Sequence, residues 1–497
     1  MTKTVRINNK KVDVYLIILD CLSGKIINEE LNKEKTIIPN LKGFANKYTF
    51  YPNCFSPGTW TPPSHASLFT GLHLSEHKVD GYKLFAPRGF TTIASMLNDI
   101  NYETYGFFAN GYFDKFFGLG EGFKNMPVFW NKDKPFVDIK TKLNIKRPFS
   151  SVKKYGIAKY LEVFFAKVIN SIYKILTDSR SVRRKSRLST KKIIKRTIKT
   201  IEKRDKPKFV CINLMEVHRD FNPPDWVKKK FNLHSMDIEQ NPTSYLAGKN
   251  HISEKEFIDL KKYYKAEIFY LDYELKALLE KLNQEDNALV VITADHGLHI
   301  GERKSSKLKE KALFDIPFSI YNELTKVPFI VKFPKGFCDS KNKDRIVQSH
   351  DIFNTICDLT GLYNKKTVSS RSLLSEKKRD FAKSELISTD YQTEGVRKYN
   401  KDFGKLELEQ YLIQRKTAIV TENLKKYIVC ENGEVEIYDL NNDPDEQKNL
   451  FEPEDGIPDF IKEKIDYVYN VRNKTVPREE NDNKEVIKNR LKELGYM

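Results

Sequence analysis

Continuous apolar runs of strand length recur along the first two thirds of the chain. They are Val14 to Leu19, Phe209 to Leu214, Ala288 to Thr293 and Val327 to Val331. Such runs are typical of strands buried on both faces of a parallel sheet. Stretches with apolar residues at helical spacing, such as Tyr263 to Leu282, lie between them. The pattern therefore predicts an α/β domain with a large, mostly parallel sheet flanked by helices.

The pattern changes after about Gly361, where short strands and charged helices replace the long apolar runs. The segments 425–429 and 434–438 look like a hairpin around Glu431-Asn432-Gly433. The tail from Pro458 is expected to be helical and highly charged. We therefore predict one domain over residues 1–362 and a C-terminal subdomain over 363–497 with a small antiparallel sheet.

Residues 151–206 are expected to form a basic helical insertion in the first domain. Apolar residues recur at helical spacing from Leu161 to Leu176, and a dense run of Lys and Arg extends from Arg180 to Arg196. An amphipathic helix beside a polybasic segment fits peripheral contact with an anionic membrane. A helix packed on the sheet with a solvated basic face explains the same pattern. We favour packing, because a large sheet needs helices to cover it.

The composition is that of a globular protein, and it does not identify a ligand. The 497 residues are 40% hydrophobic and carry a net charge of +19, which attracts anions in general. No zinc-finger, RNA-binding or helix-turn-helix signature indicates nucleic acid, and no apolar run is long enough to span a bilayer. The scattered cysteines and an N-terminus without a signal-peptide pattern lead us to expect a cytoplasmic protein. No feature indicates an oligomeric state.

Short polar segments beside these elements carry the candidate chemistry. Asp20 follows the first apolar run, and Asp295-His296-Gly297 follows the third. Thr61 precedes two prolines that suit the first turn of a helix, so its hydroxyl would face the positive end of the helix dipole and unpaired N–H groups. Each feature alone also fits a capped turn. Together, at strand ends, they indicate a divalent metal held against a nucleophile that attacks a phosphate or sulfate ester.

In this order the motifs resemble those of the sulfatase branch of the alkaline phosphatase superfamily. The segment from Thr61 to Gly71 resembles the family's nucleophile segment, and Asp295-His296-Gly297 with Gly301-Glu302 resembles its second metal motif. The string from Ile437 to Leu450 resembles the family's C-terminal Tyr-Asp-Leu…Asp-Pro-x-Glu…Asn-Leu signature. The resemblance covers nearly the whole chain. It implies an alkaline-phosphatase-like sandwich with a small C-terminal α+β subdomain.

The chain departs from the family pattern at the nucleophile. Sulfatases carry Cys-x-Pro-x-Arg, whose Cys is oxidised to formylglycine, and here the aligned residues are Thr61, Pro63 and His65. Cys54 lies too early to replace that Cys. We therefore expect no formylglycine.

Two further departures concern the metal ligands. Asp20 is followed by Cys21 where sulfatases usually have a second Asp, and Asp295 is followed by His296 where they often have Asn. At all these positions the chain resembles the threonine-nucleophile relatives of the sulfatases. These relatives include phosphodiesterases, phosphonate hydrolases and phospho-group transferases.

The resemblance implies a role for each candidate residue. Asp20, Thr61, Asp295 and His296 would bind one divalent metal ion, such as manganese, zinc, magnesium or calcium, and the metal would lower the pKa of the attacking Thr61 hydroxyl. His218 would protonate the leaving group or orient a substrate oxygen, the alternative being a satisfied strand-end histidine. The substrate anion would meet His65, His77, Asn110 and a lysine among Lys307, Lys309 and Lys311, with Lys309 as our candidate.

Three functions fit these residues. We expect a metal-dependent hydrolase of sulfate or phosphate esters that forms a covalent intermediate on Thr61. A transferase that moves phosphoethanolamine or phosphoglycerol onto a glycan or lipid would use the same ligands and differ only in the acceptor. A catalytically degenerate basic binding protein is disfavoured because Asp20, Thr61 and Asp295 are all present.

Overall fold

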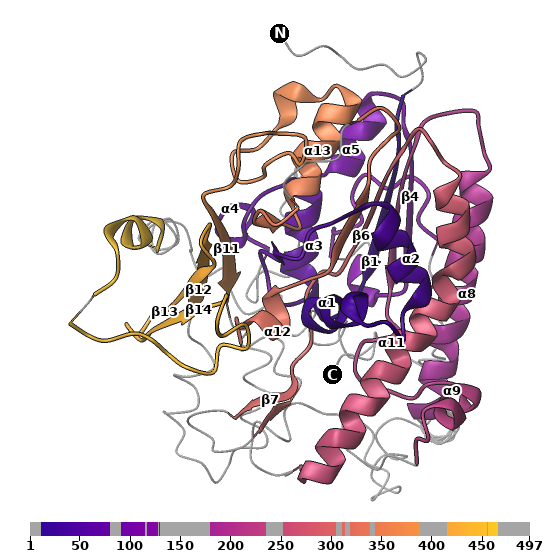
Figure 1. Cartoon of the computed structure of the whole chain (residues 1–497). Coiled ribbons are helices and arrows are strands. Elements are labelled where there is room, and N and C mark those ends of the chain that lie inside the picture. The colour runs from indigo at the N-terminus through magenta and orange to yellow at the C-terminus, as the bar shows by residue number, and fades with distance from the viewer. Residues whose placement is uncertain are drawn as a thin grey trace, which may run out of the picture.

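Six strands form the central sheet of the computed structural model, in the order β2-β9-β6-β1-β5-β4 (Figure 1). β1, β4, β5 and β6 are parallel to their neighbours among these four, whereas β9 is antiparallel to β6 and to β2. The apolar runs of the sequence thus form strands of one sheet. Their bounds are β1 (Asp13–Leu19), β2 (Thr49–Phe50), β4 (Glu103–Phe108), β5 (Lys208–Leu214), β6 (Ala288–Thr293) and β9 (Phe329–Lys332).

The structure describes residues 11–79, 91–114, 117–127, 129, 179–234, 252–304, 311–313, 319–337, 343–387, 415–454 and 456–465.

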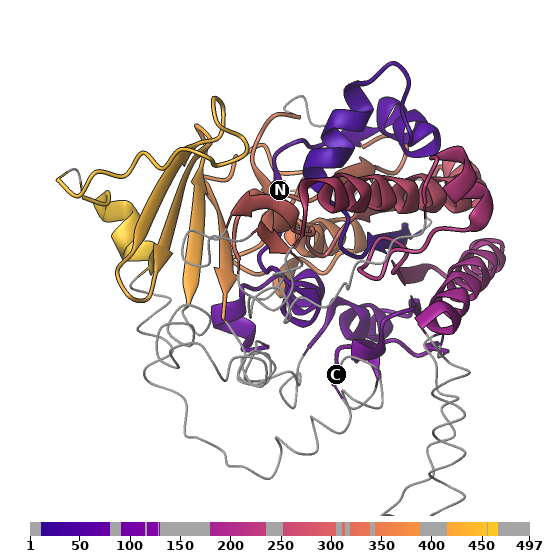
Figure 2. The same cartoon turned by 90° about the horizontal axis from the view of Figure 1, so that it is seen from below.

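Helices cover both faces of the central sheet. One face carries α2, α8 and α11, and the other carries α3, α5 and α13 (Figures 1 and 2). The longer helices are α1 (Gly24–Asn32), α2 (Pro39–Lys47), α3 (Thr61–Thr70), α5 (Ile93–Asp99), α8 (Ser179–Ile201), α11 (Glu254–Asn283) and α13 (Asp351–Thr360). The short ones are α4 (Leu74–His77), η1 (Gly111–Phe113), α9 (Asp225–Lys230), α12 (Asn322–Thr325) and η2 (Tyr363–Lys365).

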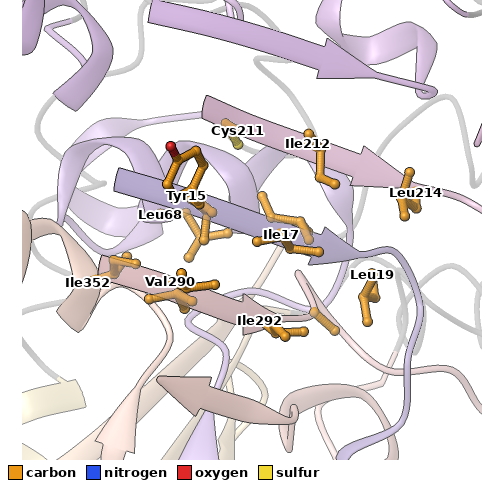
Figure 3. Packing of buried hydrophobic residues seen from close by; sticks show 14 of the residues in the cluster. Tyr15, Ile17, Leu19, Leu68, Cys211, Ile212, Leu214, Val290, Ile292 and Ile352 are labelled. Atoms are coloured by element: carbon orange, nitrogen blue, oxygen red, sulfur yellow. The ribbon is translucent and has the colours of Figure 1, made fainter. Parts of the chain in front are cut away.

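Apolar side chains pack one face of β1 against α3 and α13. Tyr15, Ile17 and Leu19 alternate along the strand and lie with Leu68 of α3 and Ile352 of α13 (Figure 3), all of them at most 2% exposed. Full burial of such a side chain stabilises the fold by roughly 1.5–3 kcal/mol. The alternate residues Leu16 and Ile18 are buried as well, so β1 is covered by other parts of the protein on both faces.

α8 agrees with the packed-helix interpretation of the basic segment over residues 189–201. Ile193, Ile194 and Ile201 are buried, while Lys192 and Lys195 are exposed. The apolar stripe predicted from Leu161 to Leu176 lies outside the described residues. Among the helices that the structure describes, none is long and apolar enough to cross a bilayer.

The C-terminal part forms a separate antiparallel sheet, in yellow at the left of Figure 1. Its order is β11-β12-β13-β14. β13 and β14 form the predicted hairpin, with Val429 paired to Val435 and Gly433 at φ 88°, a conformation that glycine adopts without strain. The bounds are β11 (Phe381–Leu386), β12 (Lys416–Thr421), β13 (Lys425–Cys430) and β14 (Val435–Asp439). Two small sheets pair β3 (Cys54–Phe55) with β10 (Val347–Gln348), and β7 (Ile300–Lys304) with β8 (Lys311–Leu313).

A buried ion pair attaches this sheet to α12. Nζ of Lys426 lies 2.6 Å from Oε1 of Glu446, and both side chains are fully buried. The backbone N–H of Asn322 donates to Oε2 of Glu446 at 2.7 Å, and Lys426 donates to Oδ1 of Asn322 at 3.0 Å. Glu446 belongs to the C-terminal Asp-Pro-x-Glu string. That string therefore has a structural role, which is to hold α12 against the C-terminal sheet.

Candidate active site

Residues from three distant parts of the chain meet at the carboxyl ends of β1 and β6. Nε2 of His296 lies 3.4 Å from Oδ2 of Asp295, 3.5 Å from Oγ1 of Thr61 and 3.9 Å from Oδ1 of Asp20. All four residues are at most 5% exposed. The structure thus brings together the four residues that the sequence suggested as nucleophile and metal ligands.

Asp20 is oriented by two amides. Nδ2 of Asn110 and Nδ2 of Asn213 donate to Oδ2 of Asp20 at 3.0 and 3.2 Å. Asn110 lies just beyond β4, and Asn213 lies in β5 beside Ile18 of β1. Because Oδ2 is held in this way, Oδ1 is the oxygen of Asp20 that faces His296.

Asp295 is held by backbone donors in the same manner. The N–H groups of Cys21 and His296 donate to its Oδ1 at 3.3 and 2.9 Å. The other oxygen, Oδ2, is buried and has no hydrogen-bond partner. A buried carboxylate oxygen without a partner is unfavourable unless a cation or another donor reaches it.

His296 presents Nε2 to the site because its other nitrogen is occupied. Nδ1 lies 2.7 Å from the carbonyl oxygen of Gly297, so Nδ1 carries the proton and Nε2 offers a lone pair. Gly297 in turn donates to the carbonyl of Leu324 in α12. A Cβ at position 297 would lie 2.0 Å from the carbonyl oxygen of Glu323, so a close backbone approach requires glycine here.

Thr61 is the first residue of α3, a helix whose every residue is buried. The preceding Trp60 is extended and makes no side-chain cap, so the hydroxyl of Thr61 is directed to His296 rather than to a helix N–H. One expectation needs correction here. Pro62 and Pro63 have no N–H, and the N–H of Ser64 donates to Trp60. The helix dipole remains, but these positions offer no free N–H groups to an anion.

His65 lies one turn after Thr61 on the same face of α3. Its Nδ1 is 2.9 Å from the carbonyl oxygen of Thr61 and 3.5 Å from Oδ2 of Asp295. Its ring packs edge-on against Phe113 at 4.9 Å. His65 therefore lies beside the nucleophile and is fixed there by apolar contact.

The two carboxylates have opposite pKa shifts. Burial acts to raise the pKa of Asp20, but the imidazoles of His218, His296 and His65 outweigh it and place the pKa below the ordinary value. Burial, followed by repulsion from Asp20, raises the pKa of Asp295 above the ordinary value. Positive charge at this point would therefore relieve a real electrostatic conflict between the two groups.

His218 follows β5 and lies near Asp20, whose pKa it acts to lower when its ring is protonated. Burial lowers the pKa of His218 to about 4, against the attraction of Asp20 and with the help of Arg219. Its imidazole is therefore neutral at neutral pH. A neutral imidazole donates one N–H and accepts at the other nitrogen.

The remaining residues predicted to contact the substrate do not all lie beside Thr61 and His296. His77 accepts from the N–H of Val79 at Nδ1 and contacts Oγ of Ser67 at 3.0 Å with Nε2, so both ring nitrogens bind protein atoms. Asn110 contacts Asp20, as described above. Lys307 and Lys309 lie outside the described residues, and Lys311 lies in β8, where the structure describes only the backbone.

Sequence reasoning missed two members of the site. Asn213 is a polar residue inside the otherwise apolar run of β5, and that interruption was the available signal. Cys21 directly follows Asp20, and its Sγ lies 3.3 Å from Oδ1 of Asp20. Burial, reinforced by both carboxylates, raises the pKa of Cys21 well above the ordinary value.

The donor set fits a divalent cation. Two carboxylates and the imidazole of His296 each have one atom held by the protein and one directed inward, and the hydroxyl of Thr61 lies beside that imidazole. Such second contacts are typical of metal ligands. The unpartnered Oδ2 of Asp295 supports the same conclusion.

Comparison with known proteins identifies the family of the chain. The family model described as sulfatase matches residues 13–362, and one described as N-sulphoglucosamine sulphohydrolase, C-terminal, matches 309–468. The N-acetylglucosamine-6-O-sulfatase of Bacteroides thetaiotaomicron is 24% identical over 233 residues, which are 46% of this chain and 38% of that protein. The match thus spans well under half of that relative.

Solved structures match over nearly the full length. The phosphonate monoester hydrolase of Agrobacterium radiobacter has a TM-score of 0.63 at 16% identity, covering 93% of this chain and 95% of that one. A structure in complex with its substrate D-glucosamine-2-N,6-O-disulfate has a TM-score of 0.58 at 15% identity, covering 93% and 97%. These similarities show an alkaline-phosphatase-like fold. Since the sulfatase model covers most of the chain, the protein belongs to the sulfatase family of ester hydrolases.

Proposed function

We propose that the protein hydrolyses a sulfate or phosphate ester through a covalent intermediate on the unmodified hydroxyl of Thr61, with a divalent metal bound by Asp20, Asp295 and His296. The observation that carries this proposal is the 3.5 Å separation between Oγ1 of Thr61 and Nε2 of His296. The inward oxygens of both carboxylates lie within 3.9 Å of the same nitrogen.

In this proposal, Thr61 is the nucleophile, and Asn110 and Asn213 orient the metal ligand Asp20. A divalent ion in this site supplies positive charge that lowers the pKa of the Thr61 hydroxyl and neutralises the ester. Oγ1 of Thr61 attacks sulfur or phosphorus, the bond to the leaving oxygen breaks, and the hydroxyl proton leaves to a base. Water then attacks the sulfur or phosphorus atom and releases Thr61. Asn110 and Asn213 keep Oδ1 of Asp20 directed into the site throughout.

His218 is the candidate proton donor to the leaving oxygen. Its neutral state at neutral pH suits donation of a hydrogen bond from one ring nitrogen. An anionic ester bound beside it would favour the protonated form and bring the pKa closer to neutral. We place His65 next to Thr61 as a second contact for the substrate or for Asp295.

The substrate class follows from the site and the relatives. A cluster with two carboxylates needs a cation before it can accept an anion, and the ester's charge is then met by the metal. One relative is named for a sulfated amino sugar, one structural neighbour holds a disulfated amino sugar, and another is a phosphonate monoester hydrolase. We therefore propose an anionic sulfate or phosphate ester as substrate.

The experiment is a matrix of metals and substrates. Metal-free protein would be loaded with manganese, zinc, magnesium or calcium and assayed with aryl sulfate, phosphate monoester, phosphodiester and phosphonate substrates. The proposal predicts metal-dependent release of the leaving group from at least one ester. Transfer to an added alcohol in preference to water would instead identify a transferase. Loss of metal dependence would contradict the proposal.

A further inference from the structure

Cys21 lies inside the candidate site. Its Sγ is 3.3 Å from Oδ1 of Asp20 and 4.0 Å from Nδ1 of His296, and the side chain is fully buried. Ligand atoms of Asp20, Cys21 and His296 all lie within 4.8 Å of one another. Within the described ranges this is the only group of three His, Cys, Asp or Glu residues with metal-ligand spacing.

The backbone holds Cys21 in an unusual conformation. Its φ is 64°, in the left-handed region that a residue with a Cβ seldom adopts. The N–H donates to Oδ1 of Asp295, and the carbonyl accepts from the hydroxyl of Tyr264 at 2.6 Å. Both backbone groups are thus held, and the held conformation places the thiol beside Asp20. Strained residues of this kind cluster at functional sites.

An independent observation indicates that this point faces a cation. Oδ2 of Asp295 is buried and accepts no hydrogen bond, although Nε2 of His296 and Nδ1 of His65 lie 3.4 and 3.5 Å away. At Asp20, the inward oxygen accepts from the weak S–H donor of Cys21 and lies 3.9 Å from Nε2 of His296. A proton on sulfur therefore points to an oxygen that the proposed function assigns to the metal.

We propose that Sγ of Cys21 is a ligand of the metal, and that the site consequently selects zinc over calcium and magnesium. This inference rests on the proposed function and narrows its four candidate metals. Thiolate and imidazole are soft or borderline ligands that favour zinc, whereas calcium and magnesium require oxygen. Zinc is bound in proteins by Cys, His and Asp in sets of about four ligands.

Ligation exchanges one bond for another. The S–H bond of Cys21 breaks, an S–Zn bond forms, and the proton leaves to solvent, so that charge and atoms balance. No oxidant or reductant takes part. Metal uptake should consequently release a proton that a serine variant would not release from this position.

The test uses the full chain, freed of metal with a chelator and titrated with cobalt(II) as a spectroscopic substitute for zinc. The wild-type protein should develop both visible d–d bands and a near-ultraviolet thiolate-to-cobalt charge-transfer band. Cys21→Ser should lose the charge-transfer band and bind zinc more than about tenfold more weakly. Cys430→Ser, a buried cysteine in β13 of the other sheet, serves as the matched control and should retain the band.

A second variant covers the case in which Cys21→Ser does not fold. Cys21→Asp supplies an oxygen ligand, and aspartate adopts the left-handed backbone more readily than cysteine. Its thermal midpoint should rise more with calcium or magnesium than that of the wild type, and less with zinc. Cobalt d–d bands in the wild type without a charge-transfer band would overturn the role of Cys21 and leave the proposed function intact. Absence of any cobalt band or metal-induced stabilisation would overturn both.

Discussion

Nε2 of His296 lies 3.5 Å from Oγ1 of Thr61, although the two residues are 235 positions apart in the chain. The first follows β6 and the second begins α3, and both are buried beside Asp20. This contact joins the metal motif to the nucleophile segment.

Replacement of Thr61 by Ala should lower the rate of ester cleavage by roughly 10³-fold or more, because the attacking oxygen is removed. The helix should persist, since Thr61 does not cap α3. Thr70→Ala, at the buried C-terminal end of the same helix, is the matched control, because the described hydrogen bonds of its hydroxyl, to the carbonyl of Ala66 and from the N–H of Leu72, are all to the backbone. Steady-state kinetics and circular dichroism on both variants check this. Equal losses in the two would show a structural effect.

His296 and His77 should respond differently to the same substitution. His296→Gln should weaken metal binding by about tenfold or more, because Nε2 faces the two carboxylates. His77→Gln should lower the thermal midpoint and leave metal affinity unchanged, because both of its ring nitrogens bind protein atoms. Isothermal titration with the metal alone separates the two. A large loss of affinity in His77→Gln would restore the sequence-based role of this residue as part of the site.

The buried carboxyl group of Glu216 should make the stability of the protein depend on pH. Burial raises its pKa to about 7, with repulsion from Glu267 adding to the shift and a hydrogen bond from Thr190 opposing it. The folded state therefore keeps a proton that the unfolded state releases between about pH 4.5 and about pH 7. The free energy of unfolding should fall as pH rises through this window, by up to about 3 kcal/mol.

Glu216→Gln removes this dependence, because the amide has no charge to bury. The variant should have a higher thermal midpoint than the wild type at pH 8 and a similar one at pH 5. Glu280→Gln, on the exposed face of α11, is the control and should follow the wild type at both values. Parallel pH profiles for wild type and Glu216→Gln would count against an elevated pKa at this position.

The ion pair between Lys426 and Glu446 should be costly to break. Lys426→Met removes the ion-pair partner of a buried carboxylate and should destabilise the protein by about 3–5 kcal/mol in denaturant unfolding. Adding Glu446→Gln should recover part of the loss, since the buried negative charge is gone. The surface pair Lys378–Glu422 is a suitable comparison, and its Lys378→Met variant should change stability by less than about 1 kcal/mol. No recovery in the double variant would show that packing, rather than charge, dominates.

Much of the site could be predicted because strand ends in a parallel sheet share one edge. The apolar runs before Asp20 and Asp295 marked β1 and β6, and their pairing places both carboxylates together. The same pattern did not reveal that β9 runs antiparallel to β6, because an apolar run carries no sign of its direction. Direction depends on the connection through space rather than on the run itself.

Residues whose role depends on tertiary contacts were harder to predict from the sequence. Asn213 orients Asp20 only because β5 lies beside β1, and the sequence does not state strand order. His77 carries the right chemistry but lies at the end of α4, where its ring contacts Ser67 of α3. The expected free N–H groups at the start of α3 are missing because two prolines and a bonded Ser64 occupy those positions.

Mass spectrometry of the reaction intermediate tests the central claim most directly. The metal-loaded protein would be mixed with a slowly hydrolysed sulfate or phosphate ester, quenched in acid and digested. Our account predicts a sulfo or phospho group on the peptide that contains Thr61. The corresponding peptide of the Thr61→Ala variant should carry no such group. An aldehyde at a cysteine, or turnover with an unlabelled Thr61 peptide and an active Thr61→Ala variant, would contradict it.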